Sequence, residues 1–172
     1  VAAPKGTPYR GAAVYRNVSL DGGASFGPDI KLADHSCECC RIALATTAGG
    51  DIAALWRHVF APNIRDHAFA VLGKSDGNPV RASLDEWKFD ACPHHGPGLA
   101  AAADGGFHAV WFGYKEGRPA VRYSRLDAGG SPSGPVRELP DAAAEHADVA
   151  AVGETVAIVW RSFDGTATRL RG

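Results

Sequence analysis

One short plan occurs three times along the chain, and this repetition limits the available folds more than any other feature. Residues 41–56, 98–111 and 148–160 each read as an apolar strand, a glycine-containing turn, a second strand and a tryptophan. The closing residues, Trp56, Trp111 and Trp160, are 55 and 49 residues apart. Repeats of about this length are the signature of architectures built from successive supersecondary units.

The runs that flank each turn are short, small and apolar, as in strands buried on both faces. Glycine in the turns supplies the positive φ that tight hairpins require. The alanine-rich segments lack helical periodicity, so we expect no substantial helix. The three tryptophans are expected to lie in the core.

A second marker recurs in phase with the first, because Asp21, Asp76 and Asp127 stand in polar turns at separations of 55 and 51 residues. The best-formed copy follows the Asp-box pattern S-x-D-x-G-x-[ST]-[WF], with Ser19, Asp21, Gly23, Ser25 and Phe26. In such a turn the carboxylate accepts backbone N–H groups, and we expect the aromatic ring to pack beneath it.

Four antiparallel strands in each period of about 50 residues predict an all-β fold, and specifically the blades of a β-propeller. Residues 9–33 read as the two outer strands of one blade, 41–87 and 98–138 as complete blades, and 147–172 as the first three strands of another. About three blades do not close a ring. We therefore expect a partial propeller, covered at its ends by remaining blades of the same protein or by a second copy.

Composition narrows the class of partner. The net charge is −1, with 22% charged residues. The chain therefore has no overall positive charge that would attract nucleic acid. No apolar run reaches the length of a membrane-spanning helix. The chain begins at Val1 without a leader, and its four cysteines are an even count. We expect export to the periplasm or the exterior, with a leader removed or lying outside this sequence.

The chemically distinctive residues share one face of the expected propeller. If strands are labelled A to D from the axis outward, the B–C loops and the links between blades lie on one face, and the Asp-box turns on the other. The distinctive face would hold Cys37, Cys39, Cys40, Arg41, His58, Asn63, Arg65, Asp66, Cys92, His94 and His95. Propellers bind ligands at the axial mouth of this face.

The cysteines have two interpretations at this stage. Cys37, Cys39 and Cys40 precede one inner strand and Cys92 precedes the next, so a disulfide from the cluster to Cys92 would join neighbouring blades. The remaining cysteines would then form a short bridge or stay free. Alternatively, Cys37, Cys39, Cys40 and Cys92 with His94 and His95 would bind copper or zinc, since thiolate and imidazole suit both metals.

The charged residues also have two interpretations. Arg41 and Arg65 would hold a carboxylate or another anion, with His58, Asn63, Asp66, His94 and His95 completing a ligand site. In the second interpretation, Arg65 forms a buried ion pair with Asp66 or takes part in an ion pair between blades. In the same interpretation His58 is a surface or packing group, as we expect His67, His108 and His146 to be.

Several segments resemble bacterial sialidase-like propellers with BNR repeats. They are the Asp-box, Cys-x-Cys-Cys-Arg at 37–41, Asn-Ile-Arg-Asp at 63–66 and Cys-Pro-His-His-Gly-Pro at 92–97. The resemblance covers essentially the whole chain. It implies an exported propeller, six- or seven-bladed when complete, that binds or cleaves glycans. In true sialidases arginines hold the substrate carboxylate, an aspartate is the acid and a tyrosine paired with a glutamate is the nucleophile. Arg41, Arg65 and Asp66 are the only counterparts, and the Tyr and Glu pair is missing from this face.

Three hypotheses follow for the function. The first is a propeller without catalytic activity that binds a partner or ligand, such as a glycan or small anion, through its Cys/His/Arg face. The second is an exo-sialidase-type glycoside hydrolase whose other catalytic residues lie outside this chain. The third is a periplasmic protein that binds copper or zinc.

Overall fold

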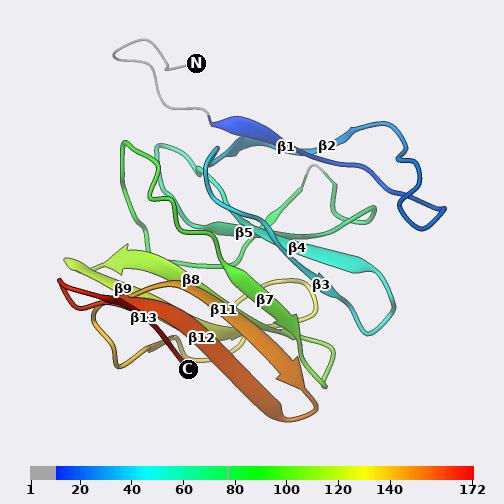
Figure 1. Cartoon of the computed structure of the whole chain (residues 1–172). Helices are drawn as coiled ribbons and strands as arrows, with labels where there is room; N and C mark the ends of the chain where they lie inside the picture. The colour runs from blue at the N-terminus through cyan, green and yellow to red at the C-terminus, as the bar shows by residue number, and fades with distance from the viewer. Residues whose placement is uncertain (1–10, 77) are drawn as a thin grey trace.

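The computed structural model describes residues 11–76 and 78–172, and every regular element in this part of the chain is a β-strand (Figure 1). The strands are β1 (Ala12–Arg16), β2 (Ile30–Ser36), β3 (Ala43–Thr46), β4 (Ile52–Arg57), β5 (His67–Val71), β6 (Val80–Arg81), β7 (Gly98–Ala101), β8 (Phe107–Lys115), β9 (Arg118–Leu126), β10 (Arg137–Glu138), β11 (Ala144–Val152), β12 (Thr155–Phe163) and β13 (Thr168–Arg171). The all-β class expected from the sequence is confirmed. With no helix among the described residues, none is present there that could span a membrane.

The thirteen strands form four antiparallel sheets, and neighbours in each sheet are also neighbours in the sequence. These are the β1–β2 sheet, the β3–β6 sheet, the β7–β10 sheet and the β11–β13 sheet. The three expected hairpins join β3 to β4, β7 to β8 and β11 to β12. Their turns contain Gly50, Gly105 and Gly153 at φ values of 83°, 88° and 57°, the left-handed region that favours glycine.

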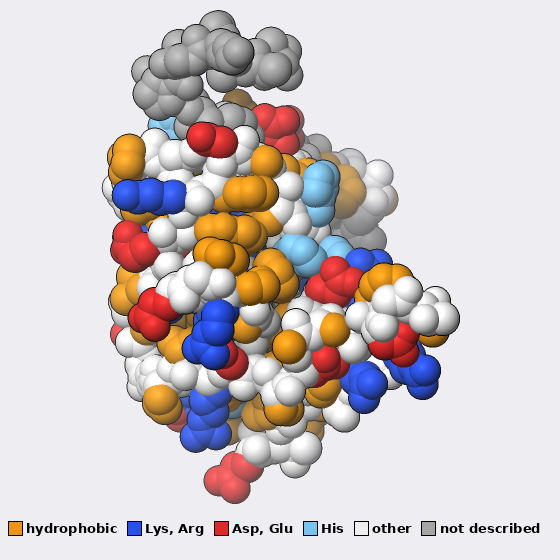
Figure 2. Space-filling model, turned by 90° about the vertical axis from the view of Figure 1, so that its left-hand side faces the viewer, with side chains coloured by type: hydrophobic (Ala, Val, Ile, Leu, Met, Phe, Trp, Pro, Cys, Tyr) orange, Lys and Arg blue, Asp and Glu red, His pale blue; other side chains and the backbone are white. Residues whose placement is uncertain are grey.

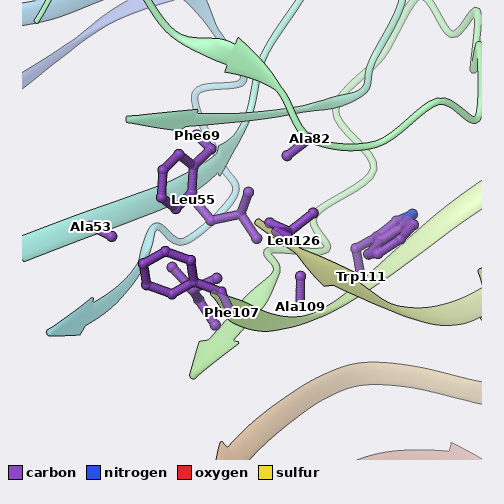
Figure 3. Packing of buried hydrophobic residues seen from close by; sticks show 9 residues of the cluster. Ala53, Leu55, Phe69, Ala82, Phe107, Ala109, Trp111 and Leu126 are labelled. Carbon is purple, nitrogen blue, oxygen red and sulfur yellow. The ribbon is translucent and has the colours of Figure 1, made fainter. Parts of the chain in front are cut away.

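The sheets are stacked face to face in chain order, and the buried side chains show why the runs are short and apolar. Figure 3 shows Leu55 and Phe69 of the β3–β6 sheet meeting Phe107, Trp111 and Leu126 of the β7–β10 sheet. Similar clusters join the β1–β2 sheet to the β3–β6 sheet, and the β7–β10 sheet to the β11–β13 sheet. Each middle sheet is therefore buried on both faces. Burying one such side chain contributes about 1.5–3 kcal/mol.

The first strands of three successive sheets lie side by side. β7 packs against both β3 and β11, and Figure 1 shows it between them. The loops that lead into these strands and the loops that join second to third strands consequently gather at one end of the sheets. That end carries the candidate site.

The three tryptophans occupy equivalent positions. In β4 and β8, the tryptophan stands one residue beyond the residue paired with the start of the first strand. In β12, Trp160 stands one residue beyond Val159, which pairs with Asp148, the first paired residue after the irregular register of β11. Trp56 and Trp111 are buried, as expected for core residues, at 1% and 2% exposure. Trp160 is only partly buried, because no further sheet covers the β11–β13 sheet in this structure.

The two end sheets leave apolar side chains in solvent. Val159 and Leu170 on the β11–β13 sheet are exposed, as are Tyr15 and Ile30 on the β1–β2 sheet. The end sheets are thus buried on one face only, whereas the two middle sheets are buried on both faces.

The Asp-box turn between β1 and β2 has the expected hydrogen bonds. Asp21 Oδ1 accepts the Ser25 backbone N–H at 3.0 Å, and Ser19 Oγ accepts the Gly23 N–H at 2.7 Å. The expectation that Phe26 packs beneath the turn is wrong, since its side chain is 62% exposed. The long connection between β1 and β2 has no sheet on its outer side against which the ring could pack.

Candidate functional site

A disulfide joins the loops that lead into two neighbouring sheets. Cys39, in the loop between β2 and β3, is bonded to Cys92, in the loop between β6 and β7, with their Cα atoms 6.5 Å apart. This confirms the expected bridge from the cysteine cluster to Cys92. Cys37 and Cys40 are free thiols.

The two free thiols lie against the disulfide. Cys37 Sγ is 3.2 Å from Cys92 Sγ, 3.4 Å from Cys40 Sγ and 4.0 Å from Cys39 Sγ. All four sulfur atoms lie within 4.8 Å of one another. Two loops that are far apart in sequence thus bring every cysteine of the chain into one compact group, which we call the cysteine cluster.

Two buried guanidinium groups accompany the cysteine cluster. Arg57, the last residue of β4, donates to the carbonyl oxygens of Arg65 at 2.7 Å and of Phe112 at 2.6 Å. It also donates to the His95 carbonyl oxygen at 3.2 Å. Arg65 donates to the Phe89 carbonyl oxygen at 2.8 Å, and its Nη1 lies 3.6 Å from Cys37 Sγ. The cluster therefore lies in a locally positive environment.

This environment changes the acidity of the two thiols. The hydrogen bond from Cys40, together with the charges of Arg65 and Arg57, lowers the pKa of the Cys37 thiol to about 6, against the effect of burial. The same hydrogen bond and burial raise the pKa of the Cys40 thiol, which is the donor. The pair thus favours one thiolate and one thiol.

A pocket of about 200 Å³ adjoins the cluster on the side of β1 and β2. Cys37, Cys40 and Trp56 line it, together with β1 residues that include Val14. Both free cysteines therefore border a cavity on this side.

The predicted anion site is largely occupied by protein groups. Asp66 is fully buried, and burial raises the pKa of its carboxyl group although Arg81 binds it. Asn63 donates to Asp90. Together with the Phe89 contact of Arg65, these partners match a packing role, and the assignment of Arg65, Asp66 and Asn63 to a ligand remains a prediction.

Arg41 and His58 lie apart from that group. Arg41 is exposed but donates to the Ala147 carbonyl oxygen at 2.6 Å, across to β11. His58 is buried, packs against the Phe60 ring at 4.6 Å between centroids, and has its pKa lowered to about 4 by burial.

A second group of potential ligands contains His95 with Glu145 and His146. One ligand atom from each lies within 4.8 Å of the others. The structure thus divides the predicted metal set, because His95 joins residues of β11 and the four cysteines form their own group. His94 belongs to neither group and is exposed.

Both histidines of this second group are poor bases. Burial, followed by the neighbouring His146, lowers the pKa of His95 to about 4. Burial and the Arg161 charge also lower the pKa of His146. Both imidazoles are therefore neutral at pH 7.

Sequence reasoning missed three residues of these groups: Arg57, Glu145 and His146. A single arginine after an apolar strand carries no signal of where its guanidinium group will be placed. Glu145 and His146 precede the third repeat by only a few residues, and their meeting with His95 depends on the stacking of two sheets.

Figure 2 shows the side of the molecule that lies on the left in Figure 1, where histidine side chains lie close to acidic and hydrophobic ones. No family model, curated protein or solved structure matches this chain. The functional argument therefore depends on the geometry of the side chains.

Proposed function

We propose that this chain is part of an exported β-propeller of the sialidase-like type and that its cysteine cluster, when reduced, binds one zinc ion. Two features support the propeller. Each sheet follows the order of its strands in the sequence, and β7 packs between β3 and β11 as inner strands do around a propeller axis. Further four-stranded sheets of the same kind would cover the exposed ends.

The placement of the four sulfur atoms carries the metal proposal. Around a tetrahedral zinc ion with Zn–S bonds of about 2.3 Å, sulfur atoms lie about 3.8 Å apart. Cys37 Sγ lies 3.2, 3.4 and 4.0 Å from the sulfurs of Cys92, Cys40 and Cys39. Small side-chain rotations would therefore suffice to surround an ion.

The charges of the surroundings favour an anionic centre. Zinc with four thiolates carries a net charge of −2. Arg57 is fully buried and takes part in no ion pair among the described residues, and Arg65 Nη1 contacts Cys37 Sγ. Two guanidinium charges beside the cluster would balance that centre, whereas a disulfide with two free thiols supplies one negative charge at most.

The disulfide and the zinc site would be alternative states of the same sulfurs. The Cys39–Cys92 bond uses two of the four ligands, so the oxidised chain would not hold the ion in this way. A disulfide is typical of an oxidising compartment, and it supports export of the protein. The ion would be acquired before oxidation or after reduction of the bridge.

Metal binding by the reduced chain tests this proposal. The chain is reduced, freed of reductant without oxygen and titrated with Co²⁺, whose thiolate complexes absorb visibly, and then with Zn²⁺. We expect one ion per chain with thiolate-to-cobalt absorption, and no such absorption in the oxidised chain. Cys37→Ser and Cys40→Ser should each weaken or abolish the absorption.

Ser36→Ala is a matched control, because Ser36 is buried beside the cluster and its Oγ has no hydrogen-bond partner. It should bind cobalt like the unchanged chain. A reduced chain without thiolate-to-cobalt absorption would refute the zinc proposal and leave the cluster as a structural disulfide. Displacement of cobalt by Cu(I) but not by Zn²⁺ would refute zinc and establish copper.

The glycoside hydrolase alternative has less support. Arg65 and Asp66, its two candidates from one loop, are buried with the Phe89 carbonyl and Arg81 as partners. Neither lines the pocket beside the cysteine cluster or the pocket beside His146. The zinc proposal explains why arginines stand beside the cysteines, which the hydrolase alternative does not.

A further inference from the structure

Three side chains meet where the loop that follows Cys92 approaches the start of β11. His95 lies in the loop that leads into β7, and Glu145 and His146 lie at the start of β11. The pairing of β11 with β12 has an irregular register between Glu145 and Asp148, and His146 has a φ of 51°. A bulge of this kind redirects a side chain. Here it brings His146 to a ring-centroid distance of 4.5 Å from His95.

His95 presents a nitrogen without a partner. Its ring stacks on Phe112 with centroids 4.1 Å apart, which fixes the plane of the imidazole. Its Nδ1 is buried and has no hydrogen-bond partner. A buried polar atom left unpaired costs free energy, so a ligand at this nitrogen would remove a penalty.

Glu145 is oriented by a neighbour. Arg161 of β12 donates to Glu145 Oε1 from Nε at 2.9 Å and from a terminal nitrogen at 2.8 Å. The other oxygen, Oε2, lies 3.9 Å from His146 Nε2. Metal-binding carboxylates are commonly held in this way, with one oxygen fixed by a hydrogen bond and the other directed at the ion.

We propose that His95, Glu145 and His146 form a second metal site, separate from the cysteine cluster, for a divalent ion of the zinc type. Two imidazoles and one carboxylate are a ligand set that such ions accept while keeping a coordination position for water or a small ligand. The site opens on the His146 side, where His146, Trp160 and Arg161 line a pocket of about 280 Å³. The inference does not depend on zinc at the cysteines.

The test uses the Cys37→Ser, Cys40→Ser double variant. It retains the Cys39–Cys92 disulfide and lacks the free thiols, so binding to the cysteine cluster is removed. Zn²⁺ is titrated calorimetrically into this oxidised chain, and we expect one ion per chain. The outcome is thus independent of the cobalt experiment on the reduced chain.

Substitutions in this background locate the ion. His95→Phe keeps the stacking on Phe112, His146→Asn suits the positive φ, and Glu145→Gln keeps an acceptor for Arg161. Each should weaken zinc binding at least about tenfold. His35→Asn is the matched control, since His35 is exposed and has a φ of 66°.

Thermal melts verify that each variant is folded. No zinc binding by the double variant, or equal binding after His95→Phe and His146→Asn, would overturn the second site.

Discussion

The loop end of the sheets and the opposite, turn end use polar residues in different ways. At the loop end, Arg57 donates to carbonyl oxygens of His95 and Phe112, which are 38 and 55 residues away in the sequence. At the turn end, Asp127 Oδ1 accepts the N–H groups of Gly129 and Ser131 at 2.9 Å, within four residues. The loop end is assembled by tertiary packing, whereas the Asp21 and Asp127 turns are held by their own residues. Asp76 is the exception at the turn end, because its carboxylate accepts from Arg16, which is 60 residues away.

This difference indicates how far the effect of a substitution should spread at each end. A polar residue such as Arg57, whose partners come from a distant loop and from β8, cannot change without disturbing both of them. A turn carboxylate with local partners is a marker of the fold, and its loss stays local. Substitutions at the two ends should therefore differ in size, and the following predictions are ordered by that size.

Arg57→Met should cause the largest loss of stability, about 3–5 kcal/mol, because one buried and two partly buried carbonyl oxygens would lose their donor. Chemical denaturation measures this loss. Arg137→Met, at an exposed position in β10, is the control and should change stability by less than about 0.5 kcal/mol. Similar values for the two variants would remove the distinction between the ends.

Cys92→Ser should lower the stability of the oxidised chain by about 2–4 kcal/mol, since the bridge closes a loop with a sequence separation of 53. The measurement is denaturation with and without reductant. Under reducing conditions without metal, the variant and the unchanged chain should have nearly the same stability. A persistent difference would mean that Cys92 packing, and not the bond, is responsible.

Acid should weaken the loop end before the turn end. The pKa of His58 falls from 6.5 to about 4 on folding, so the unfolded chain binds more protons between these pH values. Stability should therefore fall as the pH drops from about 6.5 to about 4. The turn carboxylates Asp104 and Asp21 have lowered pKa values in the folded chain, and their contribution is lost only at lower pH.

His58→Phe should reduce the slope of the upper part of this pH profile and leave the lower part unchanged. Part of the slope should remain, because the pKa of His95 is also lowered to about 4 in the folded chain. The phenylalanine ring would still pack against Phe60. Denaturation at a series of pH values measures both parts. An unchanged slope between about pH 6.5 and 4 would show that His58 is not a source of the acid sensitivity.

Asp21→Ala should have the smallest effect, because its partners Ser19 and Ser25 are exposed and lie in the same turn. We expect no measurable change in metal binding and only a local change in the amide exchange of this turn. A global loss of stability comparable to that of Arg57→Met would contradict the local character of the turn end.

The sequence allowed the sheets to be predicted because strand pattern and turn glycines act locally. The spacing of Trp56, Trp111 and Trp160 is enough to assign them to the second strands of three successive sheets. The link from the cysteine cluster to Cys92 was also predictable, since each loop precedes the first strand of a sheet. These features depend only on the period of the repeat.

The candidate site was less accessible to sequence reasoning. His95 was grouped with the cysteines because both stand in one short segment, but a loop can direct neighbouring side chains to opposite sides. The bulge that turns His146 toward His95 has no clear sequence signal. Phe26 was placed beneath its turn because the motif usually lies against a sheet, and here the turn extends into solvent.

X-ray absorption at the zinc edge tests the central claim most directly. The sample is the reduced chain with His95→Phe and His146→Asn, loaded with one zinc per chain so that only the cysteine cluster is occupied. The account predicts four sulfur neighbours at about 2.3 Å. A shell of nitrogen or oxygen neighbours, or a spectrum unchanged by Cys37→Ser and Cys40→Ser, would contradict it.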